Sequence, residues 1–172
     1  MSRGNLTDLF RGGRDEDPAE FWRATAAKRG GEIGYFTFAT LLGGSARGSD
    51  GLPGLLYAVD DALWFEDFER DNWLSKIVAG RTKYEKTELR FGRADVRYAR
   101  LVSRGGAARC IGGGVPPDRL APASFLTRAF STPAVQVAMT DGSSLFFDIM
   151  KRSQFLDLFC GKAPPASNSL PR

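Results

Sequence analysis

Residues 133–159, PAVQVAMTDGSSLFFDIMKRSQFLDLF, carry the clearest structural pattern of the chain. Apolar side chains alternate with more polar ones on both sides of Asp141 and Gly142, a dipeptide that favours a tight turn between two strands. The stretch therefore predicts a β-hairpin centred on this dipeptide.

A helix is expected directly after the hairpin. Ser153 is a suitable N-cap, because its hydroxyl can accept a hydrogen bond from a backbone N–H of the first turn. Phe155, Leu156 and Phe159 fall on one helix face, and Gly161 is a typical stop. A hairpin that leads into an amphipathic helix narrows the range of folds considerably.

The preceding residues predict another helix and further antiparallel strands. Asp17, Pro18 and Glu20 form a helix start with an N-cap, a proline at N1 and an acidic residue at N3, and Gly30 with Gly31 ends that helix. Strands are expected at 33–42, 55–59, 62–68 and 84–91, with a turn at 60–61. Residues 43–54, GGSARGSDGLPG, predict a flexible loop.

Other segments carry weaker patterns. We expect one or two helical turns at 73–80 and a short helix within 118–132 around Phe125 and Leu126, whereas the Gly- and Pro-rich positions from 105 to 117 suggest irregular structure. The expected organisation is a flexible N-terminus at 1–16, a single domain at 17–161 and a disordered tail at 162–172. The fold class is α+β and mainly β, a curved antiparallel sheet or small barrel with helices at its ends.

Composition excludes several classes of function. The chain has no histidine among its 172 residues, which removes Ser-His-Asp and Cys-His catalysis and His-ligated metal sites. Cys110 and Cys160 are too few for a disulfide framework or a four-cysteine metal site, and both are expected to be buried and inert. Since no nucleophile or nucleotide motif is present, the sequence predicts a protein that is not an enzyme and uses no cofactor.

No stretch of the sequence approaches the roughly 20 apolar residues of a membrane-spanning helix, and the first residues lack the apolar core of a secretory signal. The expected location is cytoplasmic, with a peripheral position at a membrane as an open alternative.

Charge is unevenly distributed along the chain. Six acidic residues stand against one arginine between positions 60 and 71, a net charge of −5, and ten basic residues stand against three acidic ones between 76 and 109, a net charge of +7. Turn formation at Asp60 and Asp61, and the blunting of an edge strand by Glu66, Asp67 and Glu69, explain the acidic run. The basic run suggests a face that attracts anions.

Four arginines within this basic run, Arg93, Arg97, Arg100 and Arg104, are spaced by four, three and four residues. On a helix they would form one stripe of guanidinium groups that suits phosphate. On a strand, the residues would alternate between two faces, with Arg97 outward and its neighbours inward. The sequence leaves both alternatives open.

In pattern and order, the hairpins from about residue 33 to 110 and the closing segment TDGSSLFFDIMKRSQFLDLF resemble the pleckstrin-homology-like (PH-like) superfamily, especially its GRAM and bacterial PH-like branches. The resemblance covers roughly residues 32–160. It implies a bent seven-stranded antiparallel barrel plugged at one end by the helix that carries Phe155, Leu156 and Phe159. Members bind phosphoinositides, other anionic lipids, peptides or partner domains, and very few are enzymes.

From the resemblance and the charge pattern we expect a non-catalytic binding or scaffold module that engages a partner protein or an anionic lipid surface through a basic face. The residues expected to form that face are Arg47, Lys83, Lys86, Arg90, Arg93 and Arg97. Two alternatives stay open: a self-associating structural domain, and a small-ligand carrier or enzyme that uses the barrel cavity. Nucleic acid is the least favoured partner, because few aromatic residues are interleaved with the basic ones.

Overall fold

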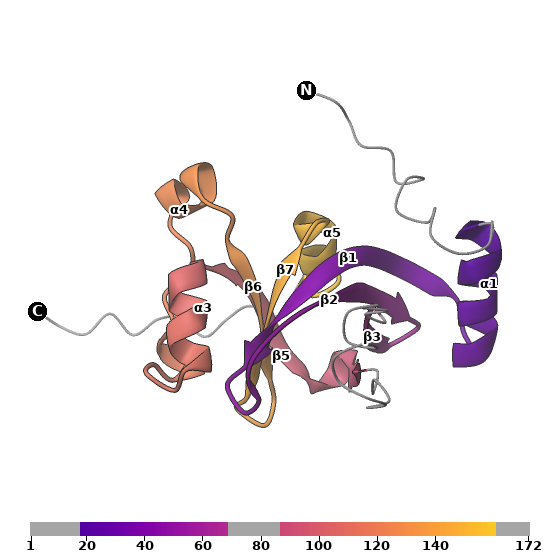
Figure 1. The fold of residues 1–172 in the computed structure, drawn as a ribbon, viewed down its shortest axis with the longest axis horizontal. Coiled ribbons are helices and arrows are strands. Elements are labelled where there is room, and N and C mark those ends of the chain that lie inside the picture. Colours follow the sequence, from indigo (N-terminus) through magenta and orange to yellow (C-terminus); the bar gives the residue numbers. More distant parts are fainter. Residues whose placement is uncertain (1–17, 69–86, 161–172) are drawn as a thin grey trace, which may run out of the picture.

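The computed structural model describes residues 18–68 and 87–160, and within them the chain forms one antiparallel sheet of seven strands with short helices around it (Figure 1). The strands are β1 (Ile33–Gly44), β2 (Gly48–Val59), β3 (Ala62–Asp67), β4 (Glu88–Gly92), β5 (Val96–Val102), β6 (Ala134–Met139) and β7 (Ser144–Ile149). The helices are α1 (Pro18–Arg29), α3 (Arg104–Ile111), α4 (Phe125–Phe130) and α5 (Arg152–Asp157), with 3₁₀ turns η2 (Arg93–Asp95) and η3 (Pro117–Arg119). The expected fold class, α+β and mainly β, is confirmed.

Several predictions concern residues that are not described: the flexible N-terminus at 1–16, the helical turns at 73–80, the stop at Gly161 and the tail at 162–172. The predicted first helix is confirmed from Pro18 to Arg29, and Gly30 adopts the positive φ of 75° that is typical of a helix end.

The sheet curls into a half-barrel. Its strand order is β4-β3-β2-β1-β7-β6-β5, and β1 joins the two halves, since it pairs with β2 along nearly its whole length and with β7 from Ala39 to Gly44. The two edge strands, β4 and β5, follow each other in the chain and are connected only by η2.

The β1–β2 hairpin is longer than its composition suggests. The expectation of a flexible loop over 43–54 is wrong, because β1 continues to Gly44, β2 begins at Gly48, and Pro53 lies opposite Thr40 in the pairing. The register shifts at Gly43, whose φ of 139° is unfavourable for other residues. Glycine here bends a paired strand, which composition alone does not distinguish from a loop.

The two predicted turns, at Asp60–Asp61 and at Asp141–Gly142, are confirmed, because each connects two strands that pair with each other. Asp60 adopts a positive φ of 50°, a conformation that aspartate tolerates, and Gly142 has a φ of 87°. The expectation that Glu66 and Asp67 blunt an edge strand is wrong, because β3 lies inside the sheet between β2 and β4, and Glu69 lies outside the described residues.

The main core fills the concave side of the half-barrel. Along β1 the buried residues alternate as Tyr35, Thr37, Ala39 and Leu41, so this strand turns one face inward. Their partners come from all the strands, including fully buried Leu56, Phe65 and Phe147. The alternation follows from the two-residue period of a strand.

Helix α5 closes this core. Phe155 and Phe159 are buried in it and Leu156 packs against it, so the predicted helix face is confirmed. The predicted cap at Ser153 is wrong: the helix begins at Arg152, and its N-cap position is Lys151, which makes no side-chain cap. Packing of the two phenylalanines, not capping, therefore positions the helix.

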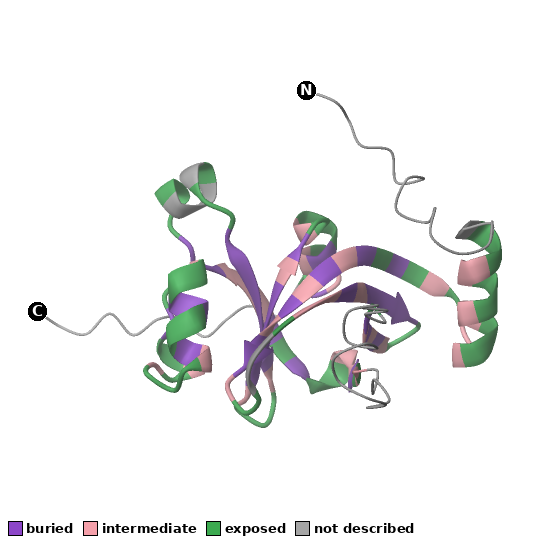
Figure 2. Cartoon of the chain, viewed as in Figure 1, coloured by how far each residue is buried: buried purple, intermediate pink, exposed green. Residues whose placement is uncertain are grey.

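Helices α1 and α3 pack against residues that are not part of the main core, and Figure 1 shows the two helices at opposite ends of the molecule. The Trp22 ring in α1 lies 4.4 Å from that of Phe36 and 6.0 Å from that of Tyr57. Helix α3 builds a second core, which contains Val102, Ala107, Cys110, Leu120, Ala134 and Phe146. Figure 2 shows the resulting division of α3 into a buried and an exposed side.

The irregular structure expected at 105–117 is wrong for residues 105–111, which belong to α3. Ser103 caps the helix, because its Oγ accepts a hydrogen bond from the backbone N of Gly106. Gly106 is needed for close packing, since a Cβ there would lie 2.9 Å from Ser103 Oγ and 3.3 Å from Leu120 Cδ2. The short helix expected around Phe125 and Leu126 is confirmed as α4.

The four regularly spaced arginines do not form a stripe. Residues 96–102 are a strand in which Val96 and Tyr98 are buried and Arg97 is exposed, so the strand alternative is confirmed. Arg93 belongs to η2 and Arg104 opens α3. The guanidinium groups therefore lie on different elements.

The two cysteines differ in their surroundings. Cys110 is buried in the second core, as expected, and burial raises the pKa of its thiol. Cys160 is exposed, so the expectation that it is buried is wrong. The chain turns Phe159 into the core at this point, which leaves the next residue on the outside.

Candidate functional site

Of the six basic residues expected to form one face, two meet on one cavity. Arg47, from the turn between β1 and β2, and Arg90, from β4, both line a cavity of about 200 Å³ at one end of the half-barrel. We call this cavity the mouth. Lys83 and Lys86 lie outside the described residues.

The other two candidates are not part of the mouth, and both face acidic residues, although Arg93 lines a second cavity together with Arg90. Arg97 on β5 has a guanidinium nitrogen 3.5 Å from a carboxylate oxygen of Asp118. Arg93 in η2 has one 4.0 Å from Asp61. The single basic face expected from the sequence is thus divided over at least three places.

Three segments that are distant in the sequence form the mouth: the β1–β2 turn, strand β4, and the β6–β7 turn. Its lining consists of Gly44, Ala46, Arg47, Leu89, Arg90, Phe91, Met139, Asp141, Ser143, Ser144 and Leu145. The lining therefore combines an arginine of the β1–β2 turn and an arginine of β4 with an apolar surface, an arrangement that can hold a negatively charged group attached to an apolar one.

Reciprocal hydrogen bonds tie the two turns of the mouth together. The backbone N of Ser45 donates to the carbonyl of Ser144 (2.9 Å), and the backbone N of Ser144 donates to the Ser45 Oγ (2.9 Å). Gly44 allows this approach, since a Cβ there would lie 3.1 Å from the Ser144 carbonyl oxygen. Arg47, whose backbone N donates to the Gly44 carbonyl (3.1 Å), is therefore presented from a fixed turn.

Arg90 alternates along β4 with the core residues Leu89 and Phe91, so its guanidinium lies on the other face of the sheet, where Trp64 also lines the second cavity described below. Arg90 lies opposite Trp64 in the β3–β4 pairing, and its guanidinium carbon is 5.3 Å from the centroid of the Trp64 ring. This cation–π contact orients the head group and consumes none of its hydrogen-bond donors.

One acidic side chain moderates the charge of the mouth. The Asp141 carboxylate accepts a hydrogen bond from the backbone N of Ser143 (2.8 Å), and its hydrogen bonds with Ser143 lower its pKa, so Asp141 is ionised at neutral pH. With two arginines against one aspartate, the mouth has a net charge of +1. This value favours a ligand with a single anionic group over a polyphosphate.

A second cavity lies on the neighbouring surface and has mixed charge. It measures about 380 Å³, and Arg29, Arg90 and Arg93 line it together with Asp60 and Asp61. Three arginines against two aspartates give this cavity a net charge of +1, the same as that of the mouth, but with two carboxylates in its lining where the mouth has one.

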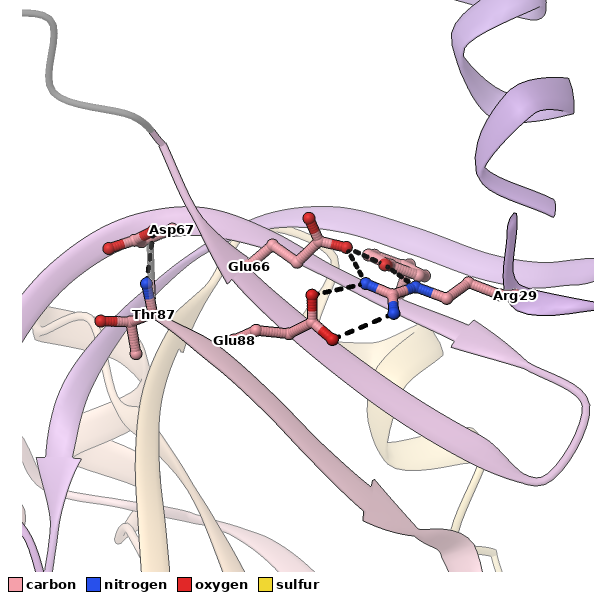
Figure 3. A network of polar contacts seen from close by, with 6 residues as sticks. Arg29, Glu66, Asp67, Thr87 and Glu88 are labelled. Atoms are coloured by element: carbon pink, nitrogen blue, oxygen red, sulfur yellow. Dashed lines mark hydrogen bonds and ion pairs between the residues drawn. The ribbon is translucent and has the colours of Figure 1, made fainter. Parts of the chain in front are cut away.

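Next to this cavity, Arg29 connects α1 to three strands (Figure 3). Its guanidinium donates to Glu66 of β3 (2.6 Å), to Glu88 of β4 (3.0 and 2.7 Å) and to the hydroxyl of Tyr57 of β2 (3.1 Å). The guanidinium also lies 3.8 Å above the ring of Trp64. We call this group the Arg29 clamp.

The positive charge of Arg29 and the negative charges of its carboxylate partners stabilise each other in the Arg29 clamp. Hydrogen bonding to Glu88 is the largest cause that raises the pKa of Arg29, and burial is the largest cause that raises the pKa of Tyr57. The Tyr57 hydroxyl donates to Glu66, so every polar group of the clamp has a partner. The clamp fixes α1 to the sheet and leaves no group available for chemistry.

Next to the Arg29 clamp, the Asp67 side chain is buried and accepts a hydrogen bond from the backbone N of Thr87 (3.1 Å), as Figure 3 also shows.

A second polar network anchors the long connection between α3 and β6. Gln136 is fully buried, and its amide nitrogen donates to the Pro117 carbonyl (3.1 Å) and to Ser144 Oγ (3.0 Å). Arg100 donates to the Gln136 amide oxygen (2.9 Å) and to the Leu120 carbonyl (2.8 Å). Arg100 therefore has a structural role.

Sequence reasoning named the two arginines of the mouth but missed both networks. Arg29 is 37 and 59 positions away from its carboxylate partners, and Arg100 is 36 positions away from Gln136. No local pattern links residues at such distances. Two features of the sequence pointed to these networks: the charged Arg29 at the end of the first predicted helix, and the polar Gln136 inside a clearly predicted strand.

Within residues 18–68 and 87–160, no three acidic or cysteine side chains gather in a way that could hold a metal ion. In the same ranges, none of the helices has the length and apolar character needed to cross a bilayer. A scan against protein-family models finds no match to this chain, and a search among curated proteins returns no significant match.

Proposed function

We propose that this chain is a non-catalytic, PH-like binding module that holds an acidic segment of a partner protein at its mouth. The PH-like part of the proposal is supported by topology. Seven antiparallel strands curl in the order β4-β3-β2-β1-β7-β6-β5, and a helix after β7 inserts Phe155 and Phe159 into the core. Both features are those that the resemblance implies.

The observation that carries the ligand assignment is the meeting of Arg47 and Arg90 beside an apolar lining. An arginine holds a carboxylate through two parallel hydrogen bonds, which gives direction as well as attraction. Leu89, Met139 and Leu145 provide a surface for an adjacent apolar side chain. An acidic residue followed by an apolar one satisfies both parts of the mouth.

The magnitude of the charge favours a peptide over a membrane at this end. Each basic residue near an anionic bilayer contributes about 1 kcal/mol, and the net charge of the mouth is only +1. A hydrogen bond to a charged group in a concave site contributes roughly 1.5–3 kcal/mol and does not need a large excess of charge. The mouth is therefore better suited to one carboxylate than to a lipid surface.

The test is a titration of ¹⁵N-labelled protein, followed by the backbone amide signals. The probe is the peptide acetyl-LEFEL-amide, and its control is acetyl-LQFQL-amide, which has the same shape without the charges. We expect shifts at residues 44–47, 89–91 and 141–145 with the acidic peptide only. Equal shifts with both peptides, or none at these positions, would refute the assignment. Shifts with inorganic phosphate but not with the acidic peptide would replace the carboxylate by a phosphate group.

A further inference from the structure

The second cavity, next to the Arg29 clamp, brings five charged side chains together with apolar ones. Arg29 comes from the end of α1, Asp60 and Asp61 from the β2–β3 turn, and Arg90 and Arg93 from β4 and η2. The apolar part of the lining consists of Val59, Ala62, Trp64 and Ala94. The volume of about 380 Å³ lies within the range of pockets that bind small molecules, roughly 300–1,000 Å³.

Three of the five charges already have an opposite charge beside them. Arg29 is held by the two carboxylates of its clamp, as Figure 3 shows. A guanidinium nitrogen of Arg93 lies 4.0 Å from a carboxylate oxygen of Asp61.

The other two charged side chains, Arg90 and Asp60, have no such partner. No ion pair joins either of them to a described residue, and none joins them to each other. One cation and one anion thus line the same cavity, each without an opposite charge. This arrangement is the complement of a molecule that carries both a carboxylate and an ammonium group.

The charge of Asp60 is not required by the turn in which it lies. Its positive φ of 50° is equally accessible to asparagine and to glycine. A Cβ on Gly31 would lie 2.1 Å from Asp60 Oδ2, so the carboxylate lies against the chain where α1 ends. A helix C-terminus presents carbonyl oxygens and the negative end of the helix dipole, which disfavour a carboxylate and favour a cationic donor.

Arg90 supplies the opposite half of the arrangement. Its cation–π contact with Trp64 uses the plane of the guanidinium and leaves the N–H donors at its edge available. A guanidinium binds a carboxylate through two parallel hydrogen bonds. The Trp64 ring beside it provides apolar surface for the remainder of a ligand.

We propose that the second cavity binds a free amino acid with an apolar side chain. Arg90 holds the carboxylate, Asp60 holds the ammonium group, and the side chain packs against Ala62 and Trp64. The inference goes beyond the proposed function, because it concerns a different cavity and a different class of ligand.

Simple ions fit this cavity less well. An anion attracted by Arg90 is repelled by Asp60 and Asp61, and a polyphosphate is repelled most strongly. A metal ion lacks ligands, since no three acidic or cysteine side chains of the described residues gather in a way that could hold one. A zwitterion satisfies both unpaired charges and adds no net charge to the site.

The experiment is a titration of the ¹⁵N-labelled full chain with L-leucine, followed by the backbone amide signals. Two controls each lack one charge: acetyl-leucine has no ammonium group, and leucine amide has no carboxylate. We expect shifts at residues 59–62 and 90–94 with leucine. Each control should bind about tenfold more weakly, because one charged hydrogen bond is lost.

Two conservative variants test the residues. Asp60→Asn keeps the turn and Arg90→Gln keeps the strand, and each should weaken leucine binding by about tenfold. The matched controls are Asp157→Asn and Arg109→Gln, which remove one exposed charge of the same sign elsewhere. Arg47→Gln, which changes the mouth but not the second cavity, should leave leucine binding unchanged, so the two sites can fail independently.

Three results would overturn the proposal. The first is an absence of shifts at residues 59–62 and 90–94 with leucine, or shifts confined to the mouth at residues 44–47 and 141–145. The second is equal affinity for leucine, acetyl-leucine and leucine amide, which would show that the paired charges are not recognised. The third is unchanged leucine binding in Asp60→Asn, which would leave a simple anion site at Arg90.

Discussion

Arg47 and Arg90 line the same cavity, although all of β2 and β3 lies between them in the sequence. The curl of the sheet brings the first hairpin turn next to the edge strand β4, and the Ser45–Ser144 hydrogen bonds hold the other side of the cavity in place. The proposed ligand site is therefore a product of the tertiary fold, and its integrity depends on the packing described above.

The Arg29 clamp should make a large contribution to stability. Replacing Arg29 with methionine keeps most of the apolar stem but leaves Glu66 and Glu88 close together without a cation. Removal of one partner from a buried pair costs about 3–5 kcal/mol, and we expect about 2 kcal/mol here because Glu88 is partly exposed. The free energy of unfolding in urea measures the effect.

Arg23 provides a matched control for this variant, since it lies exposed on the same helix. Arg23→Met should change the free energy of unfolding by less than about 0.5 kcal/mol. The triple variant Arg29→Met/Glu66→Gln/Glu88→Gln should recover part of the loss, because the uncompensated charges are removed. Equal effects of Arg29→Met and Arg23→Met would show that the clamp does not hold α1.

Gln136 should be the most sensitive polar position of the sheet. Gln136→Met keeps the volume but removes the amide that bonds Arg100, the Pro117 carbonyl and Ser144 Oγ, at an expected cost of about 1–3 kcal/mol. Hydrogen exchange should also become faster in residues 112–123, which this network anchors. Gln154→Met on the exposed side of α5 is the control, and a similar loss in both variants would contradict the role of the network.

Stability at high pH should depend on Tyr35. Burial raises the pKa of Tyr35 to about 12, above its ordinary value of 10.0, and its hydroxyl donates to the Lys151 carbonyl (3.2 Å). A raised folded-state pKa stabilises the fold fully below the unfolded value near 10, and this contribution is lost as the pH rises towards 12.

The unfolding free energy of the wild type should therefore fall more steeply than that of Tyr35→Phe, by about 1 kcal/mol near pH 11. Tyr57 has a pKa raised in the same direction and is present in both proteins, so the difference isolates Tyr35. Parallel curves for the two proteins would contradict this assignment.

Thiol reactivity should distinguish the two cysteines. Cys160 is exposed, and Cys110 is buried in the second core with a raised pKa. A thiol reagent should modify one cysteine rapidly in the native protein and two in urea, and mass spectrometry should identify the first as Cys160. Rapid modification of Cys110 in the native state would show that α3 opens readily.

Local patterns predicted most of the elements. The hairpin around Asp141 and Gly142, the turn at Asp60, the first helix and the buried face of α5 were all visible, because each depends on residues that are close in the sequence. The predicted loop at 43–54 and the irregular segment at 105–111 were wrong for the same reason: glycine was interpreted as flexibility, whereas Gly43 bends a strand and Gly106 allows close helix packing.

The site was predictable only in part. Arg47 and Arg90 could be named as basic candidates, but nothing in the sequence indicates that they share a cavity. The pairing of Arg97 with Asp118 and the internal role of Arg100 depend on contacts between distant segments. Which side chains are exposed also could not be predicted without the fold, since Phe125 and Leu126 are apolar residues of the kind found in cores and yet lie on the surface.

The binding of acetyl-LEFEL-amide to four proteins tests the central claim most directly: the wild type, Arg47→Gln, Arg90→Gln and the exposed control Arg109→Gln. Loss of one charged hydrogen bond should weaken binding by about tenfold, which corresponds to roughly 1.4 kcal/mol. The account predicts this loss for Arg47→Gln and for Arg90→Gln, with wild-type affinity for Arg109→Gln. Equal affinity of all four proteins, or an equal loss in all three variants, would contradict a binding site at the mouth.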